Sequence, residues 1–434
     1  MSTQDYPYEI KDLGPEETSE AFKYFNKHRR LEGAVRVGPK GYFLQGGFKK
    51  EAVPIYNLPL KADDVFVLSY PKSGTTWVQE LVWLIGNNLD YEQAAAIPLV
   101  KRFPFLEYSI FFNSEAAEQM FSDIYKGDEN KIKIVNEVMR KPGYKIVEGL
   151  PSPRFVKSHL PLSLLPPGLL RARVVYVARD PRDVAVSYYH HQSLTFYFRC
   201  GFTGDFTHFW DCFRKDMNLG IIISVDWTPY FEQVKEAWDK RDHPNMLFLF
   251  YEEILEVRRV MSIIKKSNEL QTLTKIGIIY IPTYYTYFMS RTKSIKYKLI
   301  QYTSGFSLIV TQKANQHSVF ENHLAPKPVT FSSFLQDLAG AVRRVAHFLG
   351  APVSEEQVVR LCDHLSFHNF KNNKCVNFDI FKYLGLVKEN AHFIRKGKAG
   401  GWREYFDEQM AAQAQQWIDD NLRGTDLRFP SVKK

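Results

Sequence analysis

The chain has 434 residues, 45% of them hydrophobic and 24% charged, which is enough to form one large α/β domain or two smaller ones. Its net charge of +9 arises within residues 257–336, with 11 Lys or Arg against 2 Asp or Glu, so the neutral remainder indicates no nucleic-acid partner. The four cysteines lack disulfide-framework or metal-ligand spacing, and no apolar run approaches the roughly 18 residues of a membrane span, which favours a cytoplasmic protein without a membrane partner.

The first predicted unit follows a polar N-terminal extension, which we assign to residues 1–41, with the domain itself spanning 42–430. Val65–Leu68 is a short apolar run typical of a buried strand, and Pro71 ends strand pairing because it lacks a backbone donor. Beyond Gly74, apolar residues recur at the spacing of one helix face. A strand–loop–helix turn aims free backbone N–H groups and the positive end of a helix dipole at one point, which suits an anion.

The loop in this unit reads Tyr70-Pro-Lys-Ser-Gly-Thr-Thr-Trp77. A nucleoside-triphosphate P-loop places its lysine directly after the second glycine, whereas Lys72 here precedes Gly74. Three hydroxyl residues add side-chain donors to the backbone ones: Ser73, Thr75 and Thr76. The loop is therefore either an anion cradle of another kind or an ordinary turn between a strand and a helix.

A second extended segment, Arg154–Pro161, carries two polar residues of interest. Lys157 and His159 stand at positions i and i+2, which places both on one face of an extended chain. A single histidine beside a strand is usually structural. Beside an anion cradle, its ordinary pKa suits it to remove a hydroxyl proton at neutral pH.

A further strand–turn–helix unit repeats the geometry of the first. Asp180 is the expected N-cap, with Pro181 at the first helical position. Arg179 stands at the end of the strand, where a planar guanidinium can hold a phosphate with two donors, and Ser187 lies two turns along the helix. The alternative is that Arg179 only pairs with Asp183.

Residues 257–336 do not fit their surroundings. They show no sustained strand or helix pattern and separate an expected strand, Met246–Tyr251, from an expected helix, Asp337–Leu349. Codons available to Glu256–Arg258 and Phe331–Gln336 can form a splice donor and acceptor, and excision keeps the reading frame. We therefore hypothesise a translated retained intron or a gene-model error over a true regulatory insertion, and expect a disordered surface segment if it is translated.

Near the C-terminus, Phe393–Trp402 is a basic, glycine-rich loop. Alone, such a loop is most often a solvated turn. Together with the two strand–loop–helix units, it could supply a second phosphate clamp.

These elements, in this order, resemble the cytosolic sulfotransferase family, which transfers a sulfuryl group from 3′-phosphoadenosine 5′-phosphosulfate (PAPS) to small acceptors. The resemblance covers roughly residues 42–256 and 337–430 and fails across the insert. It implies a PAPS-dependent enzyme with the P-loop-like sulfotransferase fold: α/β, a single domain with a central mostly parallel β-sheet flanked by helices. The loop Tyr70–Trp77 corresponds to the family's 5′-phosphosulfate loop.

The resemblance also implies a role for each matched residue. Lys72 would neutralise the bridging oxygen as it leaves, Lys157 would steady the sulfuryl oxygens, and His159 would deprotonate the acceptor hydroxyl. Arg179 and Ser187 would bind the 3′-phosphate, and Ser187 would also restrain Lys72 until acceptor is present. The remaining implied donor-site residues are Ser73, Gly74, Thr75, Thr76 and Trp77 in the loop, Tyr251 and Phe367 around the adenine, and Arg395, Lys396 and Gly397 over the phosphate.

Two departures accompany the resemblance. The family's basic loop continues Gly-Asp-Trp, whereas this chain has glycine at Gly401. The family's C-terminal dimer motif is not matched at Arg403, Asp407, Glu408 and Ala412, so dimer formation stays open. Because a sulfuryl group carries less charge than a phosphoryl group, cationic side chains can replace a metal, and we expect no Mg²⁺ requirement.

The acceptor is the least determined feature. Phe43 and the run Phe103–Tyr108 suggest a pocket for a small hydrophobic phenol or alcohol, although aromatic runs are more often plain core, and an amine acceptor stays open. His191 stands where the family often has an aromatic pocket residue, or it is a surface histidine. Two other functions compete: a nucleotide-binding protein without turnover, disabled by the insert, and a P-loop kinase, whose Walker lysine is absent.

Overall fold

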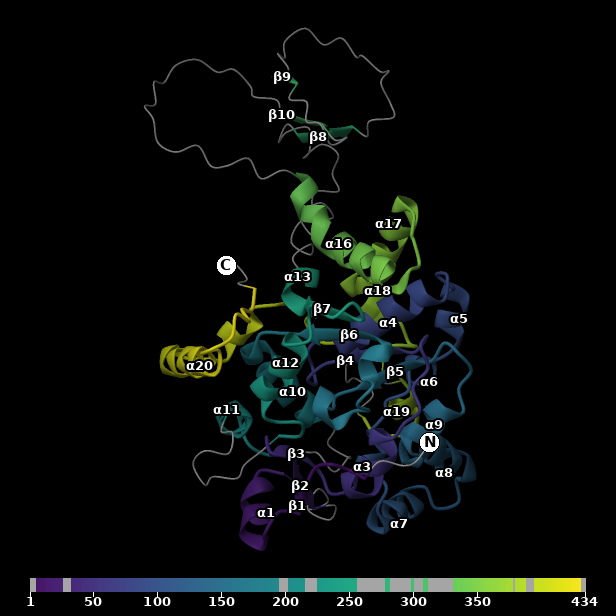
Figure 1. Cartoon of the computed structure of the whole chain (residues 1–434), viewed down its shortest axis with the longest axis vertical. Coiled ribbons are helices and arrows are strands. Elements are labelled where there is room, and N and C mark those ends of the chain that lie inside the picture. Colours follow the sequence, from purple (N-terminus) through teal and green to yellow (C-terminus); the bar gives the residue numbers. More distant parts are fainter. Residues whose placement is uncertain are drawn as a thin grey trace. The chain divides into compact units, whose positions relative to one another are not determined.

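A computed structural model describes residues 5–25, 33–194, 202–214, 225–255, 278–281, 298–299, 307–310, 331–377, 379–387 and 394–430 (Figure 1). The chain divides into two compact units. The first comprises Met1–Glu253 and Val342–Lys434, and the second comprises Ile254–Ala341. Every predicted site residue belongs to the first unit.

The first unit is built around a four-stranded sheet in the order β5-β4-β6-β7, in which each neighbouring pair is parallel. Its strands are β4 (Val65–Leu68), β5 (Phe155–Ser158), β6 (Arg173–Ala178) and β7 (Met246–Phe250). The register places Leu68 beside both Ser158 and Tyr176. Because parallel strands end at one edge of a sheet, the residues that follow them are brought together there. The predicted α/β fold with a central parallel sheet is confirmed.

The local predictions hold closely around this sheet. All four residues of β4 are buried, as expected for a parallel strand covered on both faces. The predicted helices are α4 (Thr75–Gly86) and α10 (Pro181–Leu194). Asp180 caps α10, because one carboxylate oxygen accepts the Arg182 amide at 2.9 Å. The expected strand ending at Tyr251 is one residue shorter, since Tyr251 begins the short helix α13 (Tyr251–Leu255).

The N-terminal residues pack as part of the same domain. Three short strands form an antiparallel sheet in the order β1-β2-β3: β1 (Ile10–Asp12), β2 (Ala34–Val37) and β3 (Tyr42–Gln45). Phe22 and Val35 are fully buried in the core cluster that also contains Phe66 and Tyr176. The structure therefore differs from the expected boundary between an N-terminal extension, residues 1–41, and a domain that begins at residue 42. Strands of three or four residues leave too little periodic signal to be recognised in a sequence.

In the second unit, the described residues include β8 (Ile278–Ile281), β9 (Lys298–Leu299) and β10 (Ser307–Val310), paired antiparallel in the order β8-β10-β9. Helix α16 (Phe331–Leu349) begins six residues earlier than predicted. Most of the predicted insert, residues 257–336, lies outside the described residues. Its disorder and its origin as a retained intron stay predictions.

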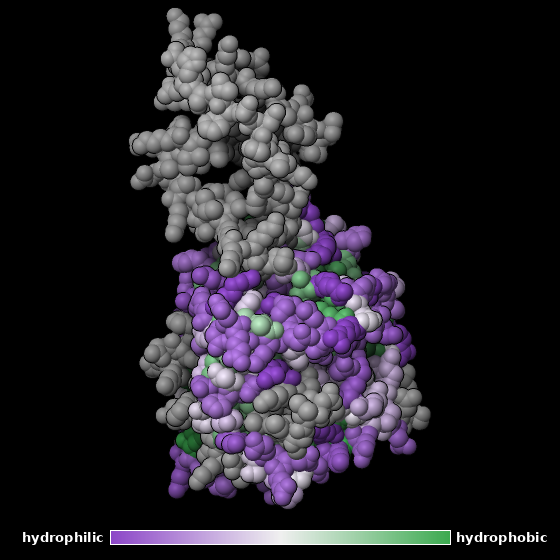
Figure 2. Space-filling view, turned by 90° about the vertical axis from the view of Figure 1, so that its left-hand side faces the viewer, coloured by the Kyte–Doolittle hydropathy of each residue, from purple (hydrophilic) through white to green (hydrophobic). Residues whose placement is uncertain are grey.

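The remaining helices cover and connect the two sheets of the first unit (Figure 1). They are α1 (Pro15–Ala21), α3 (Phe48–Tyr56), α5 (Tyr91–Ala96), α6 (Leu99–Arg102), η1 (Tyr108–Phe111), α7 (Glu115–Ile124), α8 (Glu129–Val135), η2 (Asn136–Arg140), α9 (Gly143–Glu148), η3 (Leu162–Leu164), η4 (Leu169–Arg171), α11 (Phe206–Arg214), α12 (Tyr230–Trp238), α17 (Glu355–His364), α18 (Phe367–Asn372), α19 (Asp379–Tyr383), η5 (Gly401–Glu404) and α20 (Glu408–Asn421). Among the described residues, no helix has the length and apolar character needed to cross a membrane. The residues coloured by hydropathy in Figure 2 are mainly hydrophilic on this face, as expected when the apolar side chains lie in the core.

Candidate active site

The loop that joins β4 to α4 has the backbone conformation of an anion cradle. Lys72 and Gly74 both adopt positive φ, 66° and 105°, as residues of backbone anion-binding turns do. Gly74 also lies against the ring of Tyr251, where an added Cβ would come within 2.4 Å of a ring carbon. The Ser73 hydroxyl is buried and has no hydrogen-bond partner among the described residues. A buried donor in this position is suited to a ligand oxygen.

Two lysines place their charges beside this loop. Burial and then the charges of Lys157 and Arg179 lower the pKa of Lys72 to about 7. Burial also lowers the pKa of Lys157 to about 8, and the carboxylate of Glu107 opposes that change. The lysine predicted on the glycine loop and the lysine predicted on β5 therefore lie within electrostatic reach of each other, in a site that favours binding of an anion.

His159 is held in one tautomer. Its Nδ1 lies 2.7 Å from the carbonyl oxygen of Ser69, and because a carbonyl only accepts, Nδ1 carries the proton and the Nε2 lone pair is the basic site. The rings of Phe105 and Trp227 stand edge-on to the imidazole, with centroids 5.1 and 5.3 Å away. Burial and then the charge of Lys157 lower the pKa of His159 well below its usual value. The imidazole is thus neutral at pH 7.

Ser69 connects the histidine to the glycine loop. Its hydroxyl lies 2.6 Å from the hydroxyl of Thr75 and 3.4 Å from Nδ1 of His159. Thr75 is the first residue of α4, so His159 and the glycine loop share one buried polar contact through Ser69. Sequence reasoning did not single out Ser69, although it directly precedes the recognised loop.

Glu107 is a second residue that sequence reasoning missed. Its carboxylate is fully buried and accepts the His159 amide at 2.6 Å and the Ser158 hydroxyl at 2.8 Å. Burial raises the pKa of Glu107 to about 7. The chain beside it pairs with β5 through a parallel bridge between Phe105 and Lys157, and the Lys157 ammonium lies 4.1 Å from the Phe105 ring centroid. In the sequence, the signal for Glu107 was the presence of an acidic residue within the aromatic run Phe103–Tyr108.

Arg179 joins two loops that are distant in sequence. It donates from Nη1 to the carbonyl of Lys72 and from Nη2 to the carbonyl of Lys398, both at 3.0 Å. The guanidinium carbon lies 4.3 Å from the ring centroid of Tyr251, and the buried Nε has no hydrogen-bond partner among the described residues. The alternative prediction, in which Arg179 only pairs with Asp183, is wrong for the described contacts, since its guanidinium binds these two carbonyls.

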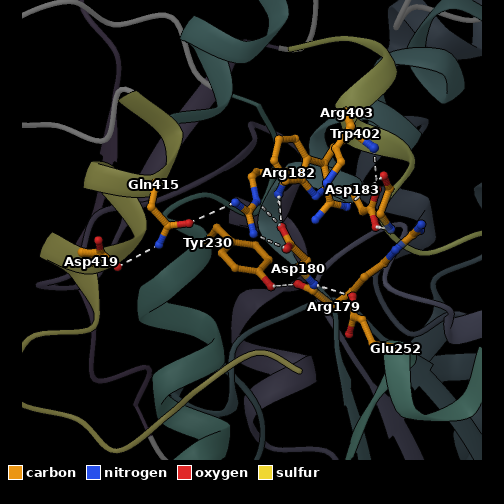
Figure 3. Close-up of polar contacts among 11 residues, drawn as sticks. Arg179, Asp180, Arg182, Asp183, Tyr230, Glu252, Trp402, Arg403, Gln415 and Asp419 are labelled. Carbon is orange, nitrogen blue, oxygen red and sulfur yellow. Dashed lines mark hydrogen bonds and ion pairs between the residues drawn. The ribbon is translucent and has the colours of Figure 1, made fainter. Parts of the chain in front are cut away.

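Asp183 contacts the basic loop instead (Figure 3). Its two carboxylate oxygens accept the amide of Gly400 at 2.6 Å and the amide of Trp402 at 2.9 Å. The guanidinium of Arg182 lies 4.1 Å from the Trp402 ring centroid and forms an ion pair with Asp180 at 2.6 Å. The first turn of α10 therefore holds the loop through both backbone and ring contacts.

The three loop residues predicted to close over a phosphate lie in this region. The charge of Arg395 also lowers the pKa of Lys72, and Arg395 donates to the Tyr405 hydroxyl at 3.4 Å. Lys396 forms an ion pair with Glu404. Gly397 has a positive φ of 52°. The charge of Arg395 thus reaches the glycine loop.

The other predicted residues lie around these contacts. Trp77 donates its indole N–H to the carbonyl of Leu365 at 3.0 Å, two residues before Phe367 begins α18. This contact brings the loop residue and the predicted adenine-stacking residue into one neighbourhood. Thr76 on α4 and Ser187 on α10 are half-buried and make no side-chain hydrogen bond among the described residues.

His191 is not a surface histidine. It is half-buried, and burial followed by the charges of Lys72 and Lys157 lowers its pKa well below the usual value. The imidazole therefore lies within electrostatic reach of the two lysines, and its place in the acceptor pocket stays a prediction. Across the part of the chain that the structure describes, no cluster of three or more His, Cys, Asp or Glu side chains is placed to hold a metal ion.

The chain matches the family model described as the sulfotransferase domain over residues 62–276 and 328–426, so the unmatched stretch falls inside the predicted insert. Luciferin sulfotransferase of Photinus pyralis is 27% identical over 399 residues, which is 90% of this chain and 80% of that protein.

Two solved structures are also similar. Retinol dehydratase in complex with androsterone and the inactive cofactor PAP is 36% identical, with a TM-score of 0.72, and the match covers 99% of this chain and all of that one. Retinol dehydratase in a complex with retinol and PAP is 36% identical, with a TM-score of 0.71 and coverage of 98% and 100%.

Proposed function

The chain belongs to the sulfotransferase domain family, and on that premise we propose that His159 is the general base by which it sulfates a small hydrophobic phenol or alcohol, with PAPS as donor. PAPS supplies the activated sulfuryl group. The observation that carries the proposal is the bond from Nδ1 of His159 to the Ser69 carbonyl, which leaves Nε2 basic beside the two lysines. A neutral imidazole with a fixed tautomer can accept a hydroxyl proton without first losing one of its own.

The residues of this chain fit the donor. Lys72 and Gly74 in the glycine loop have the positive φ angles found in backbone anion-binding turns, and the Ser73 hydroxyl and the Arg179 Nε are buried donors without a partner among the described residues. Lys72 and Lys157 would bind the sulfuryl end, and Arg179, with Arg395, would bind the nucleotide phosphates. Tyr251 and Phe367 are the proposed adenine contacts.

The acceptor side is apolar and aromatic. The Phe105 ring stacks on the Tyr108 ring at 5.4 Å and stands beside Trp227, with 6.4 Å between centroids. A cluster of flat rings next to the base suits a flat phenol or a long hydrophobic alcohol. The similar structures bind androsterone and retinol, which supports this class.

The test is a transfer assay with the full chain, PAPS and a panel of phenols, steroid alcohols, retinol and aromatic amines. We expect sulfated products from the phenols or alcohols. Because an allylic sulfate ester readily loses sulfate, the products from retinol are analysed for the corresponding alkene as well. Sulfation of only the amines would contradict the proposed acceptor class.

The base is tested in the same assay with His159→Asn, matched by His243→Asn at an exposed site. Loss of a positioned general base should lower kcat by roughly 10²–10⁴-fold. Binding of 3′-phosphoadenosine 5′-phosphate (PAP) should stay within about twofold, since His159 lies outside the proposed nucleotide contacts. A variant that retains the full rate would refute the role of His159. Tight PAP binding without transfer by the unaltered chain would favour a binding protein without turnover.

A further inference from the structure

We propose that Asp183 is a positioning residue that holds the basic loop, Arg395–Trp402, in its donor-binding conformation. The inference rests on the proposed function, because it assumes that Arg395 in this loop contacts the bound nucleotide. Sequence reasoning assigned Asp183 only a pairing role with Arg179, and the loop itself lacks the acidic residue that the family resemblance would place at Gly401.

The geometry is that of a two-point anchor. The carboxylate of Asp183 is 3% exposed, and each of its oxygens accepts one backbone amide of the loop, from Gly400 at 2.6 Å and from Trp402 at 2.9 Å (Figure 3). Bonds from amides to an ionised carboxylate are stronger than bonds between neutral groups. These two fix the φ and ψ angles of the residues between them, where Gly400 has a φ of 75°.

A second contact holds the loop on the side nearer the glycine cradle. Arg179 donates one bond to the carbonyl of Lys398 and another to the carbonyl of Lys72, so a single guanidinium spans both loops. With Asp183 in place, the segment from Lys398 to Trp402 is held at three backbone positions. Arg395 lies just before this segment, so its approach to the donor depends on how well the segment is held.

The proposed role of Asp183 requires that both oxygens of its carboxylate accept hydrogen bonds. An asparagine in place of Asp183 would keep the shape of the side chain, but its amide nitrogen cannot accept, so one of the two loop amides would lose its partner. A Cβ at Gly401 would lie 3.8 Å from the nearer carboxylate oxygen, which is an ordinary van der Waals contact. Because asparagine has nearly the same shape as aspartate, Asp183→Asn should loosen the loop without a steric clash.

The experiment compares the full chain with Asp183→Asn and with Asp407→Asn. Asp407 is a matched control, since its carboxylate also accepts one backbone amide, from Met410 at 2.7 Å, but it caps α20 outside the loop. PAP binding is measured by calorimetry, and hydrogen exchange of peptides covering residues 395–406 is measured without nucleotide.

For Asp183→Asn we expect a PAP Kd about tenfold higher, from the loss of one charge-assisted bond, and faster exchange confined to the loop. The KM for PAPS should rise by a similar factor, with kcat at saturating PAPS within about twofold, because the acceptor side is not in contact with Asp183. Asp407→Asn should change neither PAP binding nor loop exchange.

Each outcome bears on the inference. Unchanged PAP binding and unchanged loop exchange in Asp183→Asn would overturn it. Faster exchange throughout the domain would also overturn it, since that would indicate a general structural role. If the unaltered chain binds no PAP, the proposed function fails, and loop exchange alone then decides whether Asp183 anchors the loop.

Discussion

The donor side and the acceptor side of the proposed site are built in different ways. The donor side is mostly backbone, with the cations Lys72 and Arg179 added at strand ends. The acceptor side is made of side chains, with Phe105 and Trp227 packed around His159 from distant parts of the chain. In the proposed site, anion binding therefore depends on turns whose conformation follows from their local sequence. Acceptor choice depends on side chains that the fold packs together from distant parts of the chain.

The largest expected effect on the donor side is that of Lys72→Met. Removing the ammonium that faces the developing charge should lower kcat by roughly 10²–10³-fold, the range seen when one such electrostatic contact is lost. Sulfate transfer at saturating acceptor measures this, with Lys61→Met at an exposed position as the control. A rate within tenfold of the original would show that Lys72 does not act on the donor side. It would also contradict the proposed separation of a donor side from an acceptor side.

On the acceptor side, Phe105→Leu should raise the acceptor KM by about fivefold, since an aromatic contact is worth on the order of 1 kcal/mol. PAP binding should stay within about twofold, because Phe105 has no part in the phosphate loops. Phe121→Leu in the separate hydrophobic cluster serves as control and should leave both values unchanged. Equal losses in acceptor and PAP binding would show that the two sides are not independent.

A smaller effect concerns pH. Lys72 and Lys157 have pKa values lowered to about 7 and about 8, so both are protonated at low pH and lose their protons as pH rises through 7 to 8. A bound anion favours the charged forms, so PAP should bind more weakly as pH rises across this range. At pH 8, binding should take up close to one proton. Calorimetry in two buffers of different ionisation enthalpy measures the uptake, which should shrink in Lys72→Met and would be absent if the lysines titrate normally.

Metal removal should have the smallest effect. EDTA should leave the transfer rate unchanged within error, since the proposed donor side neutralises the sulfuryl group with lysine and arginine side chains. A loss of rate that added Mg²⁺ restores would show that these cations are not sufficient on the donor side.

Sequence reasoning reached the donor side because several of its segments can each be recognised from a short stretch of sequence. The strand Val65–Leu68, the glycine loop after it and the capped start of α10 are all defined by local rules, and the structure has each where it was expected. The nucleotide-binding roles of these residues stay proposals.

The contacts that hold the site together could not be read in this way. Glu107 binds the amide of His159, and Asp183 binds amides near Gly400, across separations that only the folded chain closes. No local sequence rule identifies the partner of either carboxylate. The N-terminal strands were missed for a related reason, since their pairing, not their own sequence, makes them strands.

The contact of Gly74 with Tyr251 has one more consequence. At this position, the backbone angle and the neighbouring ring exclude a side chain independently of each other, so even a methyl group meets two separate obstacles. No single compensating substitution can relieve both the backbone angle and the contact with the ring. The Tyr251 ring therefore limits the shape of the glycine loop, and both the ring position and the backbone angle would have to change before the loop could accept alanine.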